Sequence, residues 1–227
     1  MEFIQTAEFW IGLMKIIWIN IILSGDNAVV IALAARGLPP LQQRKAVLFG
    51  SGAAVVLRIA LTVVAVKLLT MPYLQIVGGV LLLYIGVQLL SDQGEGEGEE
   101  KTHGSLLAAI RTILIADLVM SLDNVIGVAA AANGSMLLLV LGLAISIPMV
   151  VFGSTMMIRL MERFPVVVTL GAALIGWVGG ETMANDTILA TLMQDQHWLH
   201  QAGPVLGAAL VLGLGYWLQK RGQTAAN

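Results

Sequence analysis

The sequence predicts an all-α, polytopic membrane protein with seven transmembrane helices, built as a 3+3 inverted repeat plus one additional C-terminal helix. Three observations lead to it. Of the 227 residues 58% are hydrophobic and only 11% are charged, against about a quarter charged in soluble domains. Apolar stretches of membrane-spanning length recur along the chain, and one acidic motif occurs twice.

Composition also excludes several classes of protein. The net charge is −2, so no basic field is present to bind nucleic acid. Cysteine is absent, which excludes disulfides, thiolate metal sites and a cysteine nucleophile. The few charged residues must therefore be judged by their positions.

The predicted spans are separated by turn residues. About 17 to 25 apolar residues cross a bilayer, and Gly, Pro and Asn-Gly pairs mark the breaks between such stretches, for example before Pro165 and at Gly203-Pro204. The seven spans are residues 9–35, 43–69, 73–90, 105–131, 135–158, 166–183 and 204–219.

Basic residues predict the orientation, because cytoplasmic loops carry an excess of Lys and Arg. With the N-terminus outside and the C-terminus in the cytoplasm, only Lys67 lies near an outer loop. The residues then on the cytoplasmic side are Arg36, Arg44, Lys45, Lys101, Arg111, Arg159, Arg163, Lys220 and Arg221.

Two halves of the chain resemble each other. Residues 20–27 match 117–124 at a shift of 97, and further on the shift becomes 92 or 93, pairing Gly50 with Gly142 and Gly78 with Gly171. Each half has three spans, an odd number, so the second half crosses the membrane in the opposite sense. The domains are a first repeat (1–91), an acidic Gly/Glu cytoplasmic linker (92–104), a second repeat (105–183), and an outer loop with the seventh span (184–227).

Asp26 and Asp123 are predicted to lie at the bilayer midplane. Asp26 precedes Arg36 by ten residues and Asp123 precedes Asn133 by ten, which is about 15 Å of helix and half of a hydrocarbon core. Antiparallel packing of spans one and four makes the two carboxylates face each other. Because carboxylates at that depth are costly unless they are compensated, a bound cation is expected.

The predicted metal ligands are oxygen donors around these two acids. They are Asp26, Asn27, Asp123 and Asn124, with the hydroxyls of Ser24 and Ser121. Oxygen ligation without Cys, and without His in any span, suits Mn²⁺, Mg²⁺ or Ca²⁺. Glycine at position 25 favours local unwinding over residues 24–26, which would add backbone carbonyls. The predicted ion pathway comprises Asn20, Asp117, Arg58 and Glu181.

Several of these residues have a second interpretation. Ser24 and Ser121 also suit simple helix–helix hydrogen bonding. Arg58 either holds an empty acidic site until substrate arrives or permanently neutralises one Asp. Glu181 is either a ligand at an ion entrance or an ordinary interfacial acid.

Outside the spans, Asn185 and Asp186 are expected to cap helices at a loop. His197 and His200, in the outer loop, either scavenge metal or belong to a solvated segment.

The duplicated motif resembles the TerC family of integral membrane proteins, and within it the smaller YjbE-type members. The resemblance covers nearly the whole chain and is carried by residues 20–27, Arg58, residues 117–124 and the GWVGGETM segment at 176–183. It implies a seven-helix fold related to LysE-type exporters, a bacterial cytoplasmic (inner) membrane location and efflux of Mn²⁺. The residues themselves argue only for a hard divalent cation.

We therefore expect a non-enzymatic transporter that exports divalent cations, with Mn²⁺ as substrate and no permanent cofactor. The expected partners are the lipid bilayer and the metal ion; a homodimer or a secretion-machinery partner stays open. One rival is a membrane scaffold that delivers metal to exported enzymes without sustained transport. Another is an intramembrane aspartyl enzyme that uses the two acids as general acid and base.

Overall fold

The computed structural model describes residues 7–22, 24–69, 71, 73–91, 105–132, 135–192 and 197–225. Within these ranges the regular secondary structure is entirely α-helical, which confirms the predicted class. The helices are α1 (Ala7–Ile22), α2 (Ser24–Ala35), α3 (Pro40–Leu69), α4 (Leu74–Ser91), α5 (Leu106–Ala132), α6 (Met136–Arg163), α7 (Val166–Ala184), α8 (Thr187–Leu192) and α9 (His197–Ala225).

Several helices are long and apolar enough to cross a membrane. In the described ranges this holds for α4, α6 and α7, for α3 over Pro40–Thr62 and for α9 over Ala202–Arg221. Shorter apolar stretches lie in α1 and α2, on either side of residue 23, which is outside the described residues. α5 has 27 residues, about 40 Å of helix, but carries charged residues. The chain is thus a multi-pass integral membrane protein.

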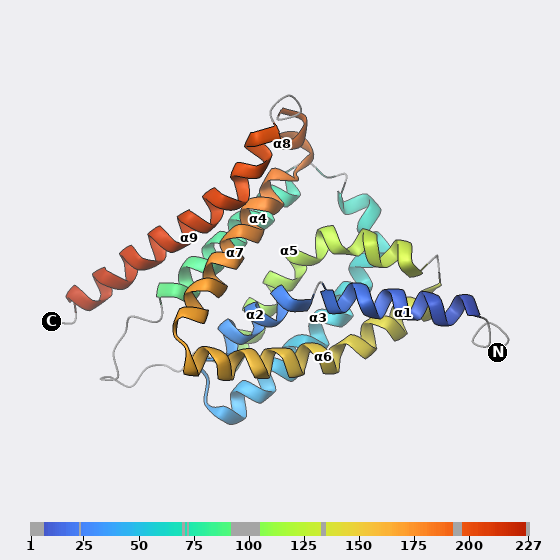
Figure 1. The fold of residues 1–227 in the computed structure, drawn as a ribbon, viewed down its shortest axis with the longest axis horizontal. Helices are drawn as coiled ribbons and strands as arrows, with labels where there is room; N and C mark the ends of the chain where they lie inside the picture. Colours follow the sequence, from blue (N-terminus) through green and yellow to red (C-terminus); the bar gives the residue numbers. More distant parts are fainter. Residues whose placement is uncertain are drawn as a thin grey trace.

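The helices pack as two groups (Figure 1). α4, α7 and α9 lie against one another, with α8 at one end of this group. In the other group α5 packs along α3, while α1 and α2 pack along α6. α2 and α5 also contact each other, so the helices that carry the two acidic motifs are neighbours.

Glycines make the contact between α7 and α9. A Cβ on Gly176 would lie 2.6 Å from the carbonyl oxygen of Gly207, and a Cβ on Gly180 would overlap the carbonyl of Gly203. The pairing runs in opposite directions along the two helices, which are therefore antiparallel. Small residues four apart let helix backbones approach closely in membranes.

The predicted break at Gly203-Pro204 is wrong. α9 begins at His197 and continues through Pro204. Gly203 is required here for close packing on α7 rather than for a turn, and membrane helices tolerate proline.

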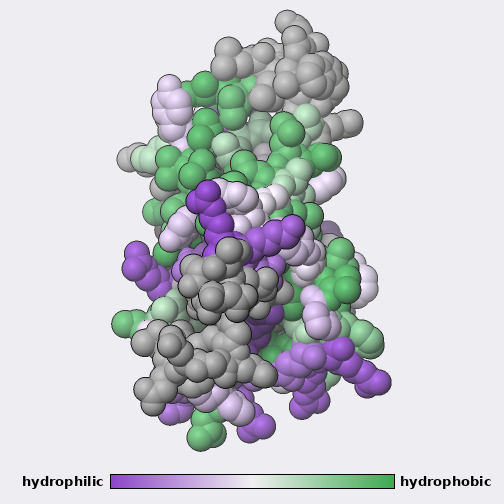
Figure 2. Space-filling view, turned by 90° about the vertical axis from the view of Figure 1, so that its left-hand side faces the viewer, coloured by the Kyte–Doolittle hydropathy of each residue, from purple (hydrophilic) through white to green (hydrophobic). Residues whose placement is uncertain are grey.

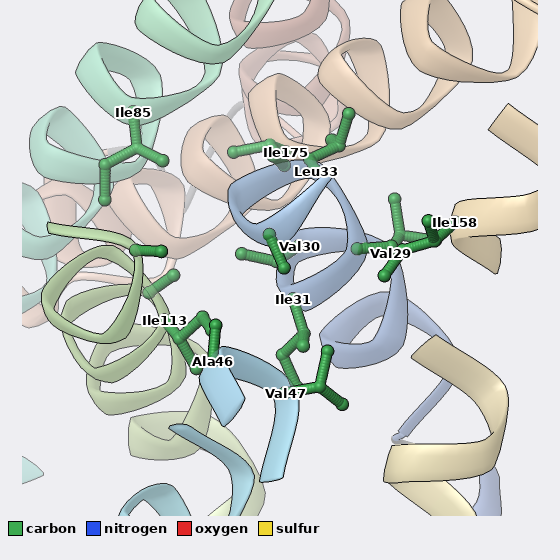
Figure 3. Close-up of a cluster of buried hydrophobic side chains, with 14 of the residues drawn as sticks. Val29, Val30, Ile31, Leu33, Ala46, Val47, Ile85, Ile113, Ile158 and Ile175 are labelled. Carbon is green, nitrogen blue, oxygen red and sulfur yellow. The ribbon is translucent and has the colours of Figure 1, made fainter. Parts of the chain in front are cut away.

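The larger apolar core surrounds α2. Residues 27–33 of α2 are buried without exception, and a helix that is buried on all sides belongs at the centre of a protein. Figure 3 shows Val29, Val30, Ile31 and Leu33 pointing in different directions from this helix, among side chains of α3, α4, α5, α6 and α7. The first acidic motif therefore sits on the central helix.

Charged side chains gather where α3 begins and where α6 and α9 end. Figure 2 looks at this end and shows hydrophilic side chains below an apolar surface. Arg221 lies over the ring of Trp217, 3.8 Å from its centroid, a contact that suits an aromatic residue at a membrane interface. The exposed charged residues here include Arg44, Lys45, Arg159, Glu162, Arg163 and Lys220.

Candidate functional site

Arg58, Asp117 and Ser121 form a buried polar network between α3 and α5. Arg58 Nη2 lies 2.5 Å from Asp117 Oδ1, and Arg58 Nε donates to Ser121 Oγ at 2.9 Å. Ser121 Oγ in turn donates to Asp117 Oδ2 at 3.2 Å. The three residues are only 5%, 7% and 0% exposed. Each charged group thus has a hydrogen-bonded partner, which burial of charge requires.

The packing of α3 on α5 explains how this network is positioned. Gly50 faces Ile113, and a Cβ on Gly50 would lie 2.8 Å from Ile113 Cδ1. Asp117 and Ser121 follow Ile113 by one and two turns on the same face of α5, while Arg58 follows Gly50 by about two turns on α3. The two helices therefore run in the same direction and bring Arg58 level with the acid.

Ser51 extends the polar face of α3, although it is not among the site residues predicted from the sequence. It is 2% exposed, and its hydroxyl has no hydrogen-bond partner in the described part of the chain. It precedes Arg58 by seven residues, so both lie on one helix face. This spacing was the signal that would have revealed it.

Asp26 and Asn27 lie beside the network, in the first turns of α2. Asp26 is half-buried, and its Oδ1 accepts a hydrogen bond from the Asn27 backbone N–H at 2.8 Å. α2, which carries Asp26, contacts both α3, which carries Arg58, and α5, which carries Asp117. Asn27 is 4% exposed. Arg58 nevertheless pairs with Asp117, and Asp26 makes no ion pair among the described residues.

The other predicted site residues divide into two sets. Asn124 is half-buried on α5, and Glu181 is exposed on α7. The side chains of Asn20, Ser24 and Asp123 lie outside the described residues, although their backbones are helical. The side chains of His197 and His200 also lie outside them.

Residues 24–26 belong to α2, so the unwinding predicted there is wrong as far as the described backbone shows. Among the described residues no group of three or more His, Cys, Asp or Glu is arranged to hold a metal.

Asp186 is a capping residue, as predicted, and it caps two helices. It is 1% exposed, and its carboxylate accepts from the backbone N–H groups of Ile188 at 3.0 Å, Tyr73 at 3.4 Å and Ile76 at 3.4 Å. It thereby joins the start of α4 to the start of α8. The first turn of a helix has free N–H groups that such an acceptor satisfies.

Comparison with known proteins gives matches over most of the chain. Residues 5–223 match the family described as "Integral membrane protein TerC family". The "Uncharacterized membrane protein YjbE" of Bacillus subtilis (strain 168) is 41% identical over 213 residues, covering 94% of this chain and 97% of that protein.

More distant relatives are longer. The "UPF0053 inner membrane protein YoaE" of Escherichia coli (strain K12) is 27% identical over 204 residues, which is 82% of this chain and 39% of that protein. The "Uncharacterized membrane protein YkoY" of Bacillus subtilis (strain 168) is 24% identical over 214 residues, which is 84% of this chain and 65% of that protein. No solved structure matches the chain significantly.

Proposed function

The chain belongs to the TerC family of integral membrane proteins, and on that premise we propose that it exports divalent metal cations, with Mn²⁺ as its ion. The ion passes through an acidic site at the middle of a bacterial inner membrane. One observation carries the proposal: the first Asp-Asn motif lies on the central helix α2, which packs against α5, the helix that bears the second motif.

The charges around α2 support a cation site. Asp26 is half-buried on α2, which contacts both α3 and α5 within the membrane region. The nearby cation, Arg58, is already bonded to Asp117 and Ser121. An acid left in that position is stabilised by a mobile cation.

Helix packing supports a seven-span inverted repeat. Gly50 of the first half faces Ile113 of the second, and Gly142 of the second half faces Ile16 of the first. At the shifts of 92 and 97 residues these are the same contact with the halves exchanged. Such exchange is what a two-fold relation between inverted halves produces, and transporters of this kind bind substrate between their halves.

The distribution of exposed basic residues supports the predicted orientation in the membrane. Exposed Lys and Arg residues gather where α3 begins and where α6 and α9 end, and α4 ends at the same end of the molecule (Figure 1). By the excess of basic residues this end faces the cytoplasm. The C-terminus is then inside and the start of α1 is outside.

The donor chemistry narrows the ion to a class, and the family resemblance narrows it further. Carboxylate, amide and hydroxyl oxygens favour hard divalent ions such as Mn²⁺, Mg²⁺ and Ca²⁺. Mn²⁺ and the outward direction come from the resemblance. Transport explains Asp26 and Asp123 better than an intramembrane aspartyl enzyme does. Each of the two acids is followed by an Asn, which suits metal coordination better than acid–base catalysis.

Flux into liposomes tests the proposal. The purified protein alone should move Mn²⁺ into vesicles loaded with a metal-sensitive dye, and Asp26→Asn and Asp123→Asn should each abolish this flux. Glu162→Gln, which changes an exposed acid at the end of α6, is the matched control and should retain it. Wild-type protein without flux would instead indicate a scaffold that hands metal to a partner.

The direction of Mn²⁺ transport is tested in cells under manganese load. Cells that express the wild type should hold less manganese than cells that express equal amounts of Asp123→Ala. Equal manganese contents in the two lines would contradict export.

A further inference from the structure

We propose that Arg58 is the specificity-determining residue of the metal site, because it cancels the charge of Asp117 and leaves a site whose charge of −2 matches one divalent cation. This inference rests on the proposed function. It assigns Arg58 a fixed role in charge selection rather than a place in the coordination shell.

The contacts of Arg58 are those of a fixed partner. Its Nη2 and Nε bind Asp117 Oδ1 and Ser121 Oγ, and Ser121 closes the ring by donating to Asp117 Oδ2. All three residues are buried, so the ion pair is screened little by water. These two hydrogen bonds hold the Arg58 side chain in the interior. We therefore assign it a permanent partner in Asp117 rather than a temporary one in Asp26.

The duplicated sequence provides an internal comparison. At the shift of 97 residues Asp117 corresponds to Asn20, and at the shift of 92 residues Arg58 corresponds to Val150. Val150 is itself buried. One half thus has an acid and a cation at these two positions, and the other half has a neutral residue at both. The negative charge of Asp117 thus occurs together with the positive charge of Arg58. The net charge of the two positions is zero in both pairs.

The remaining acids then set the valence. In the proposed metal site Asp26 and Asp123 contribute −2 when both are ionised, and a divalent cation neutralises them completely. Without Arg58 the site would carry −3, and without Asp117 it would carry −1. Because α2, which carries Asp26, contacts both α3 and α5, either change alters the field at the metal.

The test uses four proteins: wild type, Arg58→Gln, Asp117→Asn, and the double variant Arg58→Val with Asp117→Asn, which reproduces the residues of the other half. Two quantities are measured in detergent on the full chain: the affinity for Mn²⁺ by calorimetry and the midpoint of thermal unfolding. Arg159→Gln, an exposed arginine of α6, is the matched control for loss of a positive charge.

The two quantities are expected to move differently. Both single variants should unfold at lower temperature than the wild type, because each leaves a buried charge without its partner. The affinity for Mn²⁺ should fall about tenfold in Asp117→Asn and rise about tenfold in Arg58→Gln, as expected when one unit charge near the metal is removed. The double variant should recover both quantities to near wild type, and the control should change neither.

Two results would overturn the inference. One is a folded double variant that no longer binds Mn²⁺, since the pair would then belong to the ligand set. The other is a loss of affinity in both single variants that merely follows their loss of stability, which would indicate a structural role alone. Failure of the proposed function is distinct, because the wild type would then bind no Mn²⁺ while the unfolding temperatures still report whether Arg58 and Asp117 neutralise each other.

Discussion

Gly180 of α7 and Gly203 of α9 meet backbone to backbone. A Cβ on Gly203 would lie 2.9 Å from the Gly180 carbonyl oxygen, and a Cβ on Gly180 would overlap the Gly203 carbonyl. The neighbour in both cases is main chain, which cannot rotate out of the way as a side chain can.

Gly180→Ala is therefore expected to destabilise the protein by about 1–3 kcal/mol, the usual cost of overpacking. Thermal unfolding in detergent, followed by tryptophan fluorescence, measures the effect. Gly213→Ala on α9 is the matched control, because a Cβ there meets nothing within 4 Å. Equal unfolding temperatures for the two variants would contradict the backbone contact.

The exchanged glycine contacts give an asymmetric prediction. A Cβ on Gly142 would overlap Ile16 at its branched Cβ and Cγ2 atoms, whereas a Cβ on Gly50 would lie nearest the tip of Ile113, 2.8 Å from Cδ1, and 3.2 Å from its Cγ2. The tip can rotate and the branch cannot. Gly142→Ala should lower the unfolding temperature more than Gly50→Ala, and Gly52→Ala, with open space around it, should not lower it by this mechanism. The reverse order would contradict this account of the packing.

Ser121→Ala removes the acceptor of Arg58 Nε and a donor to Asp117. We expect a loss of about 1–3 kcal/mol, because a buried charged donor is left without its partner. Chemical or thermal unfolding measures it. Thr155→Ala is the comparison: the Thr155 hydroxyl is exposed and bonds only to the Val151 carbonyl of its own helix, so its loss should matter little. Similar losses in the two variants would show that the network contributes nothing particular.

Asp186→Ala should loosen the starts of α4 and α8 together. The loss is expected to be about 1–2 kcal/mol, as for other helix caps, and hydrogen exchange should speed up at the amides of Tyr73, Ile76 and Ile188. Asp186→Asn keeps one acceptor oxygen and should lie between Asp186→Ala and the wild type. Faster exchange at only one of the two helices would mean that Asp186 does not join them.

Hydropathy predicted most of the helical architecture, because lipid leaves the backbone few alternatives to the helix. Two predictions of local structure were wrong: the unwinding over residues 24–26 and the start of α9. A Gly-Pro pair predicts a turn when only neighbouring residues are considered. Gly203 is instead needed for the contact with Gly180 of α7, a helix that precedes α9 in the sequence. Asp186 was predictable as a cap because its bond to Ile188 is local, whereas its contacts with Tyr73 and Ile76, which are distant in sequence, were not predictable.

The partner of Arg58 was not predictable from spacing. Asp26, Asp117 and Asp123 all lie within predicted spans, so each was a candidate for an arginine in span two. The choice depends on which helix lies beside α3 and in what register. The contact between Gly50 and Ile113 decides it, and such a contact has no signature in the linear sequence until the two halves are aligned.

The pairing of Arg58 with Asp117 has a consequence for biosynthesis. The ribosome completes α3 well before α5, since 59 residues separate the two charges. Until α5 arrives, the arginine must enter the bilayer without its counter-ion, at a cost of about 2.5–3.5 kcal/mol on translocon insertion scales. We therefore expect the amino-terminal half to integrate less completely when it is made alone than when the carboxyl-terminal half follows it.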